Sequence, residues 1–397
     1  MGRKSTQAGF LRKRSAHGHH RVTYVELFFD LVFVFAVTQV SHTLLAHFTP
    51  HGVLEVTLLF FAVWWAWVFT SWVTNWLDPE RTPVRLMLFA LMLAGLVLST
   101  SIPKAFETRA LAFALAYVSM QVGRSLFTLW SIPDHERGLK LNFVRISIWL
   151  AFTGGLWISG ALIGGTSQIV FWALALMIEY SSPIARFWTP GLGATSVSDW
   201  SVEGGHMAER CALFIIIALG ESILVTGATF AGLSWTPDII AAFAFSFLGS
   251  IAMWWIYFHR GADAGAERIS RSKDPGRLAR LAYTYLHLPI VAGIVVAAVG
   301  DEVVLIHPHG HADAKAVFGL VGGPLIFLVG TLFFKQTIHG RLQLSHLVGL
   351  AALIALVFAG PKLSPLTLSA ATTIIILVVA GWEAWSLRDE TPIKPEI

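Results

Sequence analysis

Charged residues are scarce in this sequence. Of its 397 residues, 13% are Asp, Glu, Lys or Arg, whereas hydrophobic residues make up 55%. A soluble domain carries about 25% charged residues, so this chain cannot cover a water-exposed surface of the usual kind. Intrinsic disorder is excluded as well, because it requires few apolar residues. The composition therefore predicts an all-α integral membrane protein.

Cysteine is nearly absent too. Cys211 is the single cysteine, so an internal disulfide is excluded. The sequence has no phosphate-binding loop, dinucleotide fingerprint, zinc-protease motif or hydrolase nucleophile motif, and no soluble segment large enough to hold such a site. We therefore expect no cofactor and no nucleic-acid partner, and an enzyme is the less favoured class of function.

Histidines alternate in two places. One group lies in the N-terminal tail and the other in a predicted external loop: His17, His19 and His20, and His307, His309 and His311. Alternating histidines can bind Zn²⁺ or Cu²⁺, but no supporting ligand shell accompanies either group. We expect no metal site, and whether the second group binds metal stays open.

Twelve segments are apolar enough to cross a membrane as helices, which takes roughly 20 residues each. Their approximate extents are 24–48, 53–76, 84–102, 106–131, 142–163, 167–183, 206–231, 236–258, 278–300, 314–334, 342–360 and 365–387. Arg124 interrupts the fourth and Gly322-Gly323-Pro324 the tenth. Ten or eleven spans are therefore alternatives to about 12 transmembrane helices.

Lysine and arginine are unevenly divided between the two sides of these spans. With the N-terminus in the cytoplasm, one side holds most of them, and the opposite side keeps only Lys104, Arg109, Lys315 and Lys362. Positive residues accumulate in cytoplasmic loops. We therefore predict that the N- and C-termini are both cytoplasmic.

The two halves of the chain resemble each other in chain order. Residues 62–69 (AVWWAWVF) match 252–259 (AMWWIYFH), and 122–127 (VGRSLF) match 329–334 (VGTLFF). Each span pairs with the sixth span after it, which gives two parallel six-helix repeats, as in some transporters. The predicted organisation is a basic tail (1–22), a first repeat (23–183), a linker (184–205), a second repeat (206–388) and a cytoplasmic tail (389–397).

Two conspicuous motifs begin the two halves. Residues 25–39 read VELFFDLVFVFAVTQ, and residues 209–222 read ERCALFIIIALGES. They resemble the two motifs of the low temperature requirement protein A (LtrA) family, and the resemblance covers nearly the whole chain. It implies a multi-pass protein of the bacterial plasma (inner) membrane. The family name comes from a growth phenotype, so the resemblance supplies no mechanism.

Ionisable residues inside the predicted spans are the candidate site, because a charge at the membrane centre costs ~2.5 kcal/mol or more. The predicted substrate or ion pathway comprises Glu26, Asp30, Arg124, Glu209, Arg210 and Glu221. Secondary candidates are His206, Glu179, Glu383 and His287. No catalytic residue is assigned.

Depth in the membrane ranks these candidates. Glu26 and Asp30 lie one turn apart on one helix face. Arg124 lies at about the depth of Asp30, so we expect it to pair with Asp30, Glu26 or Glu221. Arg210 is expected at the interface, where its side chain can reach the headgroups. Glu221 falls near the middle of its span and is the strongest candidate.

Each candidate also has a structural interpretation. The glutamates near helix ends, which include Glu179 and Glu383, are as compatible with interfacial acids as with site residues. Asp30 with Arg124 could be a static clamp between helices, and His287 fits a hydrogen-bonded packing residue.

Three functions fit this pattern. The leading one is a transporter or channel for an ion or small solute, in which buried carboxylates bind and release protons or attract cations. A membrane-embedded enzyme acting on a lipid or isoprenoid would use the carboxylates and histidines as acids and bases. A sensor or scaffold linked to low-temperature growth would use the charges only to hold helices together. The expected partners are the lipid bilayer and a small solute or ion, protons included, and a homo-oligomer is left open.

Overall fold

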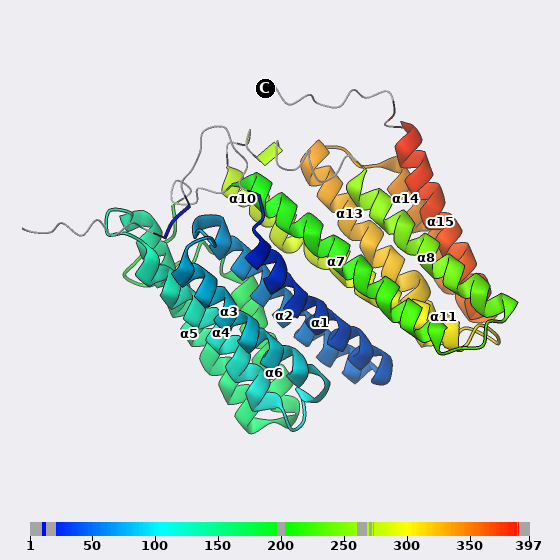
Figure 1. Cartoon of the computed structure of the whole chain (residues 1–397), viewed down its shortest axis with the longest axis horizontal. Coiled ribbons are helices and arrows are strands. Elements are labelled where there is room, and N and C mark those ends of the chain that lie inside the picture. Colours follow the sequence, from blue (N-terminus) through cyan, green and yellow to red (C-terminus); the bar gives the residue numbers. More distant parts are fainter. Residues whose placement is uncertain are drawn as a thin grey trace, which may run out of the picture. The chain divides into compact units, whose positions relative to one another are not determined.

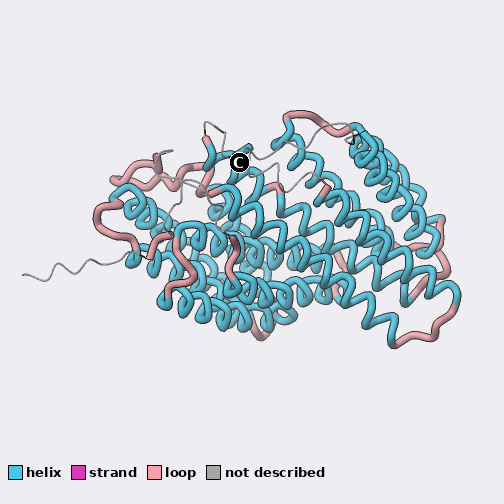
Figure 2. Tube along the Cα trace, turned by 45° about the horizontal axis from the view of Figure 1, so that its top comes forward, coloured by secondary structure: helices cyan, strands magenta, loops and turns pink. Residues whose placement is uncertain are grey.

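The computed structural model describes residues 10–12, 21–196, 203–259, 268–269, 272, 274–386 and 388. Within these ranges the protein is helical, and the only β pairings are two isolated bridges, Leu11 with Leu77 and Thr189 with Gly193 (Figure 2). The predicted all-α fold is confirmed. Most of the N-terminal tail, with its three histidines, and most of the C-terminal tail lie outside the described residues.

The chain divides into two compact units. The first comprises residues 1–210 and 269–279, and the second comprises 211–268 and 280–397. The first unit contains the helices α1 (Tyr24–Ala46), α2 (Pro50–Trp76), α3 (Thr82–Ser101), α4 (Ala110–Ser131), α5 (Arg137–Ile163) and α6 (Gly165–Ser181) (Figure 1). It also holds the start of α7 (Gly204–Ala231) and the short helix α10 (Pro275–Ala279).

The second unit holds the rest of α7 and the helices that follow. These are α8 (Pro237–Phe258), the π-helical turn η3 (Arg280–Tyr285), α11 (His287–Ile306), α12 (Ala314–Val317), the π-helical turn η4 (Phe318–Gly322), α13 (Gly323–His339), α14 (Leu344–Ala359) and α15 (Pro365–Ser386). Short 3₁₀ turns follow α3 (Ile102–Lys104) and α14 (Gly360–Lys362).

Local sequence signals set several helix boundaries. Thr49 caps α2 by accepting a hydrogen bond from the Gly52 amide at 3.0 Å, and Pro50 occupies the first helical position. Thr236 and Pro237 begin α8 in the same way. Such caps satisfy amide groups that have no partner inside the helix, and proline there loses no hydrogen bond.

Eleven helices in the described ranges are long and apolar enough to cross a membrane. The sixth predicted segment forms α6, which has 17 residues and extends about 25 Å at 1.5 Å per residue. The fifth helix begins at Arg137, before the predicted residue 142, and the helical segment that contains the ninth span runs from Pro275 to Ile306 instead of 278–300. Those extensions carry polar residues that hydropathy alone assigns to loops.

The helices of each unit pack largely in chain order. In the first unit, α1 lies against α2 and α3, consecutive helices pack from α3 to α6, and α2 contacts α4 and α6. In the second, α13 lies between α11 and α14, and α15 contacts α14 and α8. Buried tryptophans fill much of the first unit's core, among them Trp64, Trp65 and Trp157.

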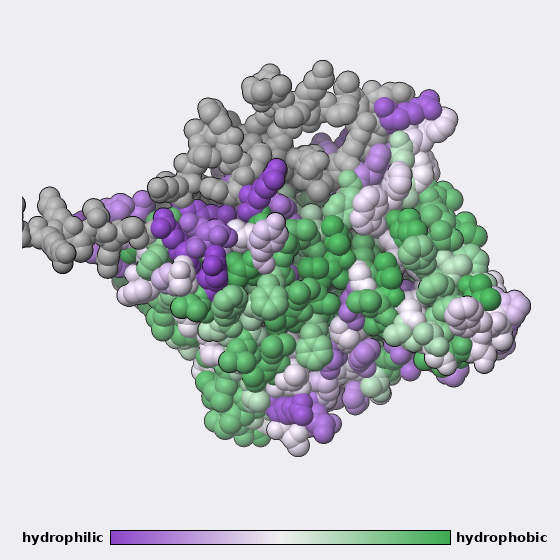
Figure 3. All heavy atoms as spheres, in the orientation of Figure 1, coloured by the Kyte–Doolittle hydropathy of each residue, from purple (hydrophilic) through white to green (hydrophobic). Residues whose placement is uncertain are grey.

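Apolar side chains also cover the outside of the helices. On the face drawn in Figure 3 the sides of the helices are largely hydrophobic, and polar residues gather toward helix ends. Large exposed hydrophobic residues include Leu93, Phe152 and Phe358. Exposed apolar area of this extent fits contact with lipid, so the protein is a polytopic membrane protein.

Candidate functional site

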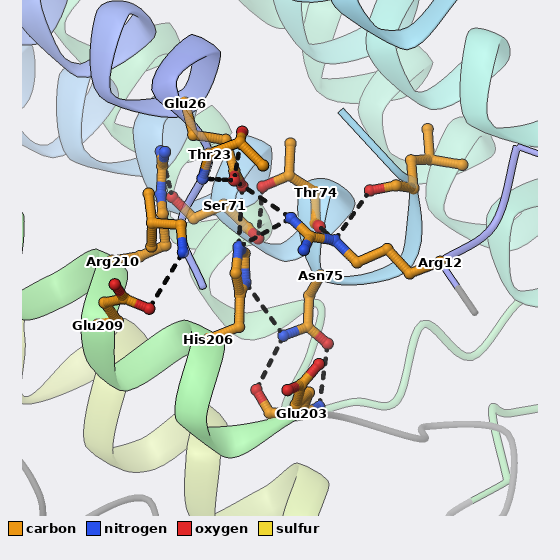
Figure 4. Close-up of polar contacts among 12 residues, drawn as sticks. Arg12, Thr23, Glu26, Ser71, Thr74, Asn75, Glu203, His206, Glu209 and Arg210 are labelled. Carbon is orange, nitrogen blue, oxygen red and sulfur yellow. Dashed lines mark hydrogen bonds and ion pairs between the residues drawn. The ribbon is translucent and has the colours of Figure 1, made fainter. Parts of the chain in front are cut away.

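Four of the predicted site residues meet in the first unit. Glu26 and Asp30 from the first two turns of α1 lie against His206 and Arg210 from the first two turns of α7. Figure 4 shows Glu26, His206 and Arg210 together with their neighbours. Residues at the end of α2 and Arg12 of the N-terminal segment complete the group. All four charged or titratable side chains from α1 and α7 are fully buried. We refer to Arg12, Glu26, Asp30, His206 and Arg210 as the charged cluster.

Glu26 is held in place by its own helix start. Its Oε2 atom accepts hydrogen bonds from the backbone amide and the hydroxyl of Thr23, both at 2.9 Å. Thr23 precedes the first residue of α1, so this is the return half of a capping box. Contacts within the start of α1 alone therefore position the Glu26 carboxylate.

Glu26 joins the cluster through both carboxylate oxygens. Its Oε1 lies 2.9 Å from His206 Nε2, and its Oε2 accepts a hydrogen bond from Arg12 Nη2 at 3.2 Å. Arg12 is anchored in turn, since its Nε donates to the carbonyl oxygen of Thr74 at 2.7 Å. The N-terminal segment thereby contributes a buried cation to the site.

The second ring nitrogen of His206 is oriented by Asn75. The Asn75 Oδ1 atom accepts from the Glu203 amide at 3.1 Å, and its Nδ2 donates to the Glu203 carbonyl at 2.9 Å. This arrangement fixes the side-chain amide so that Nδ2 faces His206 Nδ1 at 3.4 Å. With His206 neutral and its proton on Nε2, that nitrogen can donate to Glu26, and Arg12 Nη2 also lies 3.2 Å from it.

Asp30 and Arg210 form a second ion pair one turn deeper in both helices. Arg210 Nη2 and Trp67 Nε1 both donate to Asp30 Oδ1 at 2.7 Å, and Arg210 Nη2 also reaches the Ser71 hydroxyl at 3.2 Å. The guanidinium lies 5.7 Å from the centre of the Trp67 ring. The expectation that Arg210 extends to the membrane interface is wrong, because Asp30 holds it inside the protein.

This second pair is incompletely hydrogen-bonded. Asp30 Oδ2, Arg210 Nε and Arg210 Nη1 are buried and have no hydrogen-bond partner among the described residues. An arginine and a carboxylate can form two parallel hydrogen bonds, which is the stronger geometry. Here Asp30 Oδ1 accepts the hydrogen bonds from both Arg210 and Trp67. Asp30 Oδ2 and two nitrogens of Arg210 can therefore still form hydrogen bonds at the centre of the site.

The two contacts that join α1 to α7, Glu26 with His206 and Asp30 with Arg210, have matched spacing. Glu26 and Asp30 are four residues apart on α1, His206 and Arg210 are four apart on α7, and each pair spans 180 residues of sequence. Residues four apart lie on one face of a helix. The two helix starts therefore meet through complementary acidic and basic faces. Glu209, on another face of α7, accepts a hydrogen bond from the Val22 amide at 3.1 Å.

Arg124 does not belong to the charged cluster. It is buried and donates to the carbonyl oxygen of Ala66 at 3.1 Å, to the Thr70 hydroxyl at 2.8 Å and to Gln121. The predicted pairing of Arg124 with Asp30, Glu26 or Glu221 is wrong. Equal depth does not imply contact, because Arg124 on α4 is directed at the backbone of α2.

Arg124 instead begins a chain of hydrogen bonds to Glu179. Gln121, which accepts from Arg124, donates to the Tyr117 hydroxyl at 3.1 Å, and Tyr117 donates to Glu179. Trp157 Nε1 also donates to Glu179, at 3.0 Å. Glu179 is buried and fully engaged, so it is not an interfacial acid.

Glu383 has a direct partner in the second unit. Lys335 on α13 donates to Glu383 and also to the carbonyl oxygen of Ile256 at 2.6 Å. Both side chains of the pair are buried. Sequence reasoning placed Lys335 in a cytoplasmic loop because the tenth span was ended at residue 334, whereas α13 continues to His339.

The remaining candidates lie in the second unit. His287 contacts the Tyr257 hydroxyl and the Ala282 carbonyl, both at 2.7 Å, which agrees with a packing histidine. Glu221 is buried in α7, next to Ser222. Asp301, which sequence reasoning placed in a loop, is a buried residue of α11, and the Ser222 hydroxyl lies 3.4 Å from its Oδ2. The apolar residues that follow Asp301 in the sequence could have indicated that the helix continues past it.

Metal ligands are not grouped in the described part of the chain. No three His, Cys, Asp or Glu side chains there are placed to hold one ion. The side chains at 307, 309 and 311 are exposed, and His309 lies 3.3 Å from Asp238.

In comparisons with known proteins, the chain matches one protein family. Residues 21–381 match the family described as bacterial low temperature requirement A protein (LtrA). An uncharacterized protein of Rhizobium meliloti (strain 1021) is 41% identical over 382 residues, which cover 96% of this chain and 92% of the relative. No solved structure matches the chain.

Proposed function

The chain belongs to the bacterial low temperature requirement A family, and from that premise and the charged cluster we propose that it transports a small ion or solute across the bacterial plasma membrane. In this proposal the charged cluster takes up and releases protons, which couple to the transported species. The observation that carries the proposal is the incompletely bonded, fully buried pair of Asp30 and Arg210.

The hydrogen bonding of this pair argues against a purely static clamp. Removing two charges from water costs several kcal/mol per ion, which excellent geometry and full hydrogen bonding can repay. Asp30 Oδ2 and two nitrogens of Arg210 make no such bonds within the described residues. Burying this pair therefore costs free energy that its hydrogen bonds do not fully repay. Such a pair fits a site in which Asp30 and Arg210 exchange partners during function.

His206 is the group in the cluster best suited to bind a proton. Histidine is the side chain whose ordinary pKa lies nearest neutral pH. With His206 neutral, the negative charges of Glu26 and Asp30 balance the positive charges of Arg12 and Arg210. A proton on His206 leaves one positive charge in excess at a buried site, where charges interact strongly. Rearrangement of the α1 and α7 starts would relieve that excess.

Arg124 and Lys335 support the further proposal that the two units are parallel repeats. Arg124 donates to the carbonyl oxygen of Ala66, and Lys335 donates to that of Ile256. Ala66 and Ile256 occupy the same place in the two matched Trp-Trp segments. The contacts of α2 with α4 and α6 correspond to those of α8 with α13 and α15. Repeats of this kind are common in transporters.

Proton flux in liposomes tests the proposed function. The purified full chain is reconstituted in vesicles that contain a pH-sensitive dye, and a membrane potential or a gradient of Na⁺, K⁺ or Cl⁻ is imposed. We expect proton movement above that of protein-free vesicles. His206→Gln, which keeps an N–H donor for Glu26 but cannot take up a proton, should reduce it at least tenfold.

His51→Gln is the matched control. His51 is exposed and lies 3.2 Å from Glu55 on α2, so this change also removes a histidine beside a glutamate. The control should retain the wild-type flux. Wild-type protein that moves no protons under any of the gradients, or a His206→Gln variant with unchanged flux, would contradict the proposal.

A further inference from the structure

Asp301, a buried carboxylate of the second unit, has no cationic partner among the described residues. Asp301 on α11 is 8% exposed, and no lysine, arginine or histidine pairs with it among the residues that the structure describes. The Ser222 hydroxyl donates a long hydrogen bond of 3.4 Å to its Oδ2. An isolated buried carboxylate is costly, and inside a membrane helix it marks a functional site by default.

A small cavity adjoins Asp301. Its volume is about 30 Å³, which corresponds to one or two water molecules or a single dehydrated ion. Side chains of α8, α11 and α15 and the η4 turn line it, and most of the polar ones carry hydroxyls, including Ser246, Ser250, Thr372 and Thr373. All these elements belong to the second unit.

Two of these hydroxyls have unused bonding capacity. Thr372 Oγ1 is buried and has no hydrogen-bond partner in the described part of the chain. Ser246 Oγ is buried as well and has no hydrogen-bond partner among the described residues, and it lines the same cavity as Asp301. Buried hydroxyls are normally satisfied, so two such hydroxyls beside a carboxylate supply oxygen atoms that can bind a ligand.

The wall of the cavity formed by the η4 turn is fixed by close backbone packing. A Cβ atom on Gly300 would lie 2.5 Å from backbone atoms of Gly319 and Leu320, and both of these residues line the cavity. They belong to the π-helical turn η4, a backbone irregularity that is frequent at functional sites. The cavity is therefore part of the fold rather than a gap that neighbouring helices can close.

We propose that this cavity binds one dehydrated monovalent cation, Na⁺, through the Asp301 carboxylate and the hydroxyl oxygens of Ser246 and Thr372. Oxygen ligands favour hard cations. One carboxylate neutralises one positive charge, whereas a divalent ion would leave an excess charge at a buried site. The inference concerns the second unit and does not depend on proton coupling at the charged cluster.

Equilibrium binding of ²²Na⁺ to the purified chain in detergent tests the site. The protein is held at constant ionic strength in N-methyl-D-glucamine chloride, and NaCl replaces that salt stepwise. We expect saturable binding of one Na⁺ per chain and a saturable rise in thermal unfolding temperature, because a ligand that binds only the folded state stabilises it. K⁺ should compete weakly, and Ca²⁺ should not compete.

Matched variants assign the binding to these residues. Asp301→Asn should abolish it, and so should Ser246→Ala combined with Thr372→Val, which removes two ligands while Asp301 stays in place. Asp238→Asn, an exposed aspartate at the start of α8, should bind Na⁺ as the wild type does.

Three results would overturn the inference. These are no saturable Na⁺ binding by the wild type, unchanged binding in both site variants, or competition by K⁺ or Ca²⁺ as strong as that of Na⁺. The first would mean that a protonated Asp301 and water occupy the cavity. Because the experiment uses no vesicles and no proton gradient, its failure leaves the proposed transport function untouched, and the reverse also holds.

Discussion

At the residue scale, the charged cluster of the first unit contains two adjacent ion pairs, Arg12 with Glu26 and Asp30 with Arg210. Glu26 has two hydrogen-bond donors from its own N-cap residue in addition to Arg12 and His206, whereas Asp30 depends on Trp67 and Arg210. If Arg210 is lost, Asp30 therefore keeps fewer other hydrogen-bond donors than Glu26 keeps when Arg12 is lost. The pair of Asp30 and Arg210 is the more sensitive of the two to mutation.

We expect Asp30→Asn to destabilise the protein strongly. The change leaves Arg210 buried without a counter-ion, and breaking a buried ion pair in this way costs about 3–5 kcal/mol. Thermal unfolding in detergent, followed by tryptophan fluorescence, should show a clear fall in the midpoint. A double variant, Asp30→Asn with Arg210→Gln, should recover most of the loss because it leaves no unpaired charge.

Asp134→Asn provides the control for this measurement. Asp134 is exposed in the loop before α5, and a hydrogen bond from Lys140 lowers the pKa of its carboxyl below the ordinary value. The control therefore removes a paired negative charge from the surface, where such pairs contribute at most about 1 kcal/mol. If Asp30→Asn unfolds at the same temperature as Asp134→Asn, the buried pair of Asp30 and Arg210 does not stabilise the folded protein.

Four of the five members of the charged cluster could be predicted from the sequence, but Arg12, which lies in the polar tail, and the pairing of the residues could not. Charges within or near an apolar run single out Glu26, Asp30, His206 and Arg210. Hydropathy gives depth along a helix and does not show which helices face each other, so depth alone pairs Arg124 with Asp30, Glu26 or Glu221, whereas Asp30 pairs with Arg210. The four-residue spacing shared by the acidic and basic residues was the signal that favoured the correct partners.

At the scale of elements, α11 and the π-helical turn η4 are in closer contact than ordinary side chains permit. Gly300 approaches the backbone of Gly319 and Leu320, and Gly293 approaches that of Phe327 on α13. Small residues let membrane helices approach closely and gain van der Waals contact. The packing of these elements requires glycine at both positions.

Gly300→Ala should therefore destabilise the second unit. The added methyl group would meet backbone atoms at 2.5 Å, and overpacking of this kind costs typically about 1–3 kcal/mol. Gly381→Ala on the exposed face of α15 is the control, because nothing lies within 4 Å of its Cβ position. That control should be neutral or slightly stabilising, since alanine favours helix by roughly 1 kcal/mol over glycine. Unfolding in denaturant measures both variants, and equal effects would contradict the packing argument.

Helix positions were predictable because length and hydropathy determine spans, but helix ends were not. Each of the twelve predicted segments coincides with a helix of the structure. The errors lie where a helix continues past its apolar run, at Arg137 on α5, at Lys335 on α13 and at Asp301 on α11. Backbone hydrogen bonding continues through such polar residues when their side chains find partners or a cavity inside the protein. Asp301 and Lys335, two of the buried ionisable residues, were missed for this reason.

At the scale of the whole molecule, the open question of topology reduces to one helix. Eleven helices meet the length and hydropathy of a span, and α6, with 17 residues, is the one predicted segment that falls short. A hydrophobic core of about 30 Å is a few Å longer than such a helix, and local thinning of the bilayer can accommodate the mismatch. If α6 does not cross, every loop after it changes sides.

Three single-cysteine variants decide this point in a Cys211→Ala background, which removes the single, buried native cysteine. Lys104→Cys precedes α6, Lys362→Cys follows α14, and His135→Cys lies between α4 and α5, all at exposed positions. The excess of positive residues predicts that the first two face outward and the third faces the cytoplasm. A membrane-impermeant maleimide should therefore label Lys104→Cys and Lys362→Cys in intact cells, and His135→Cys only after permeabilisation. Labelling of Lys104→Cys without Lys362→Cys would show that α6 does not cross, which would rule out two parallel six-span repeats, because equivalent loops of the two units would then lie on opposite sides of the membrane.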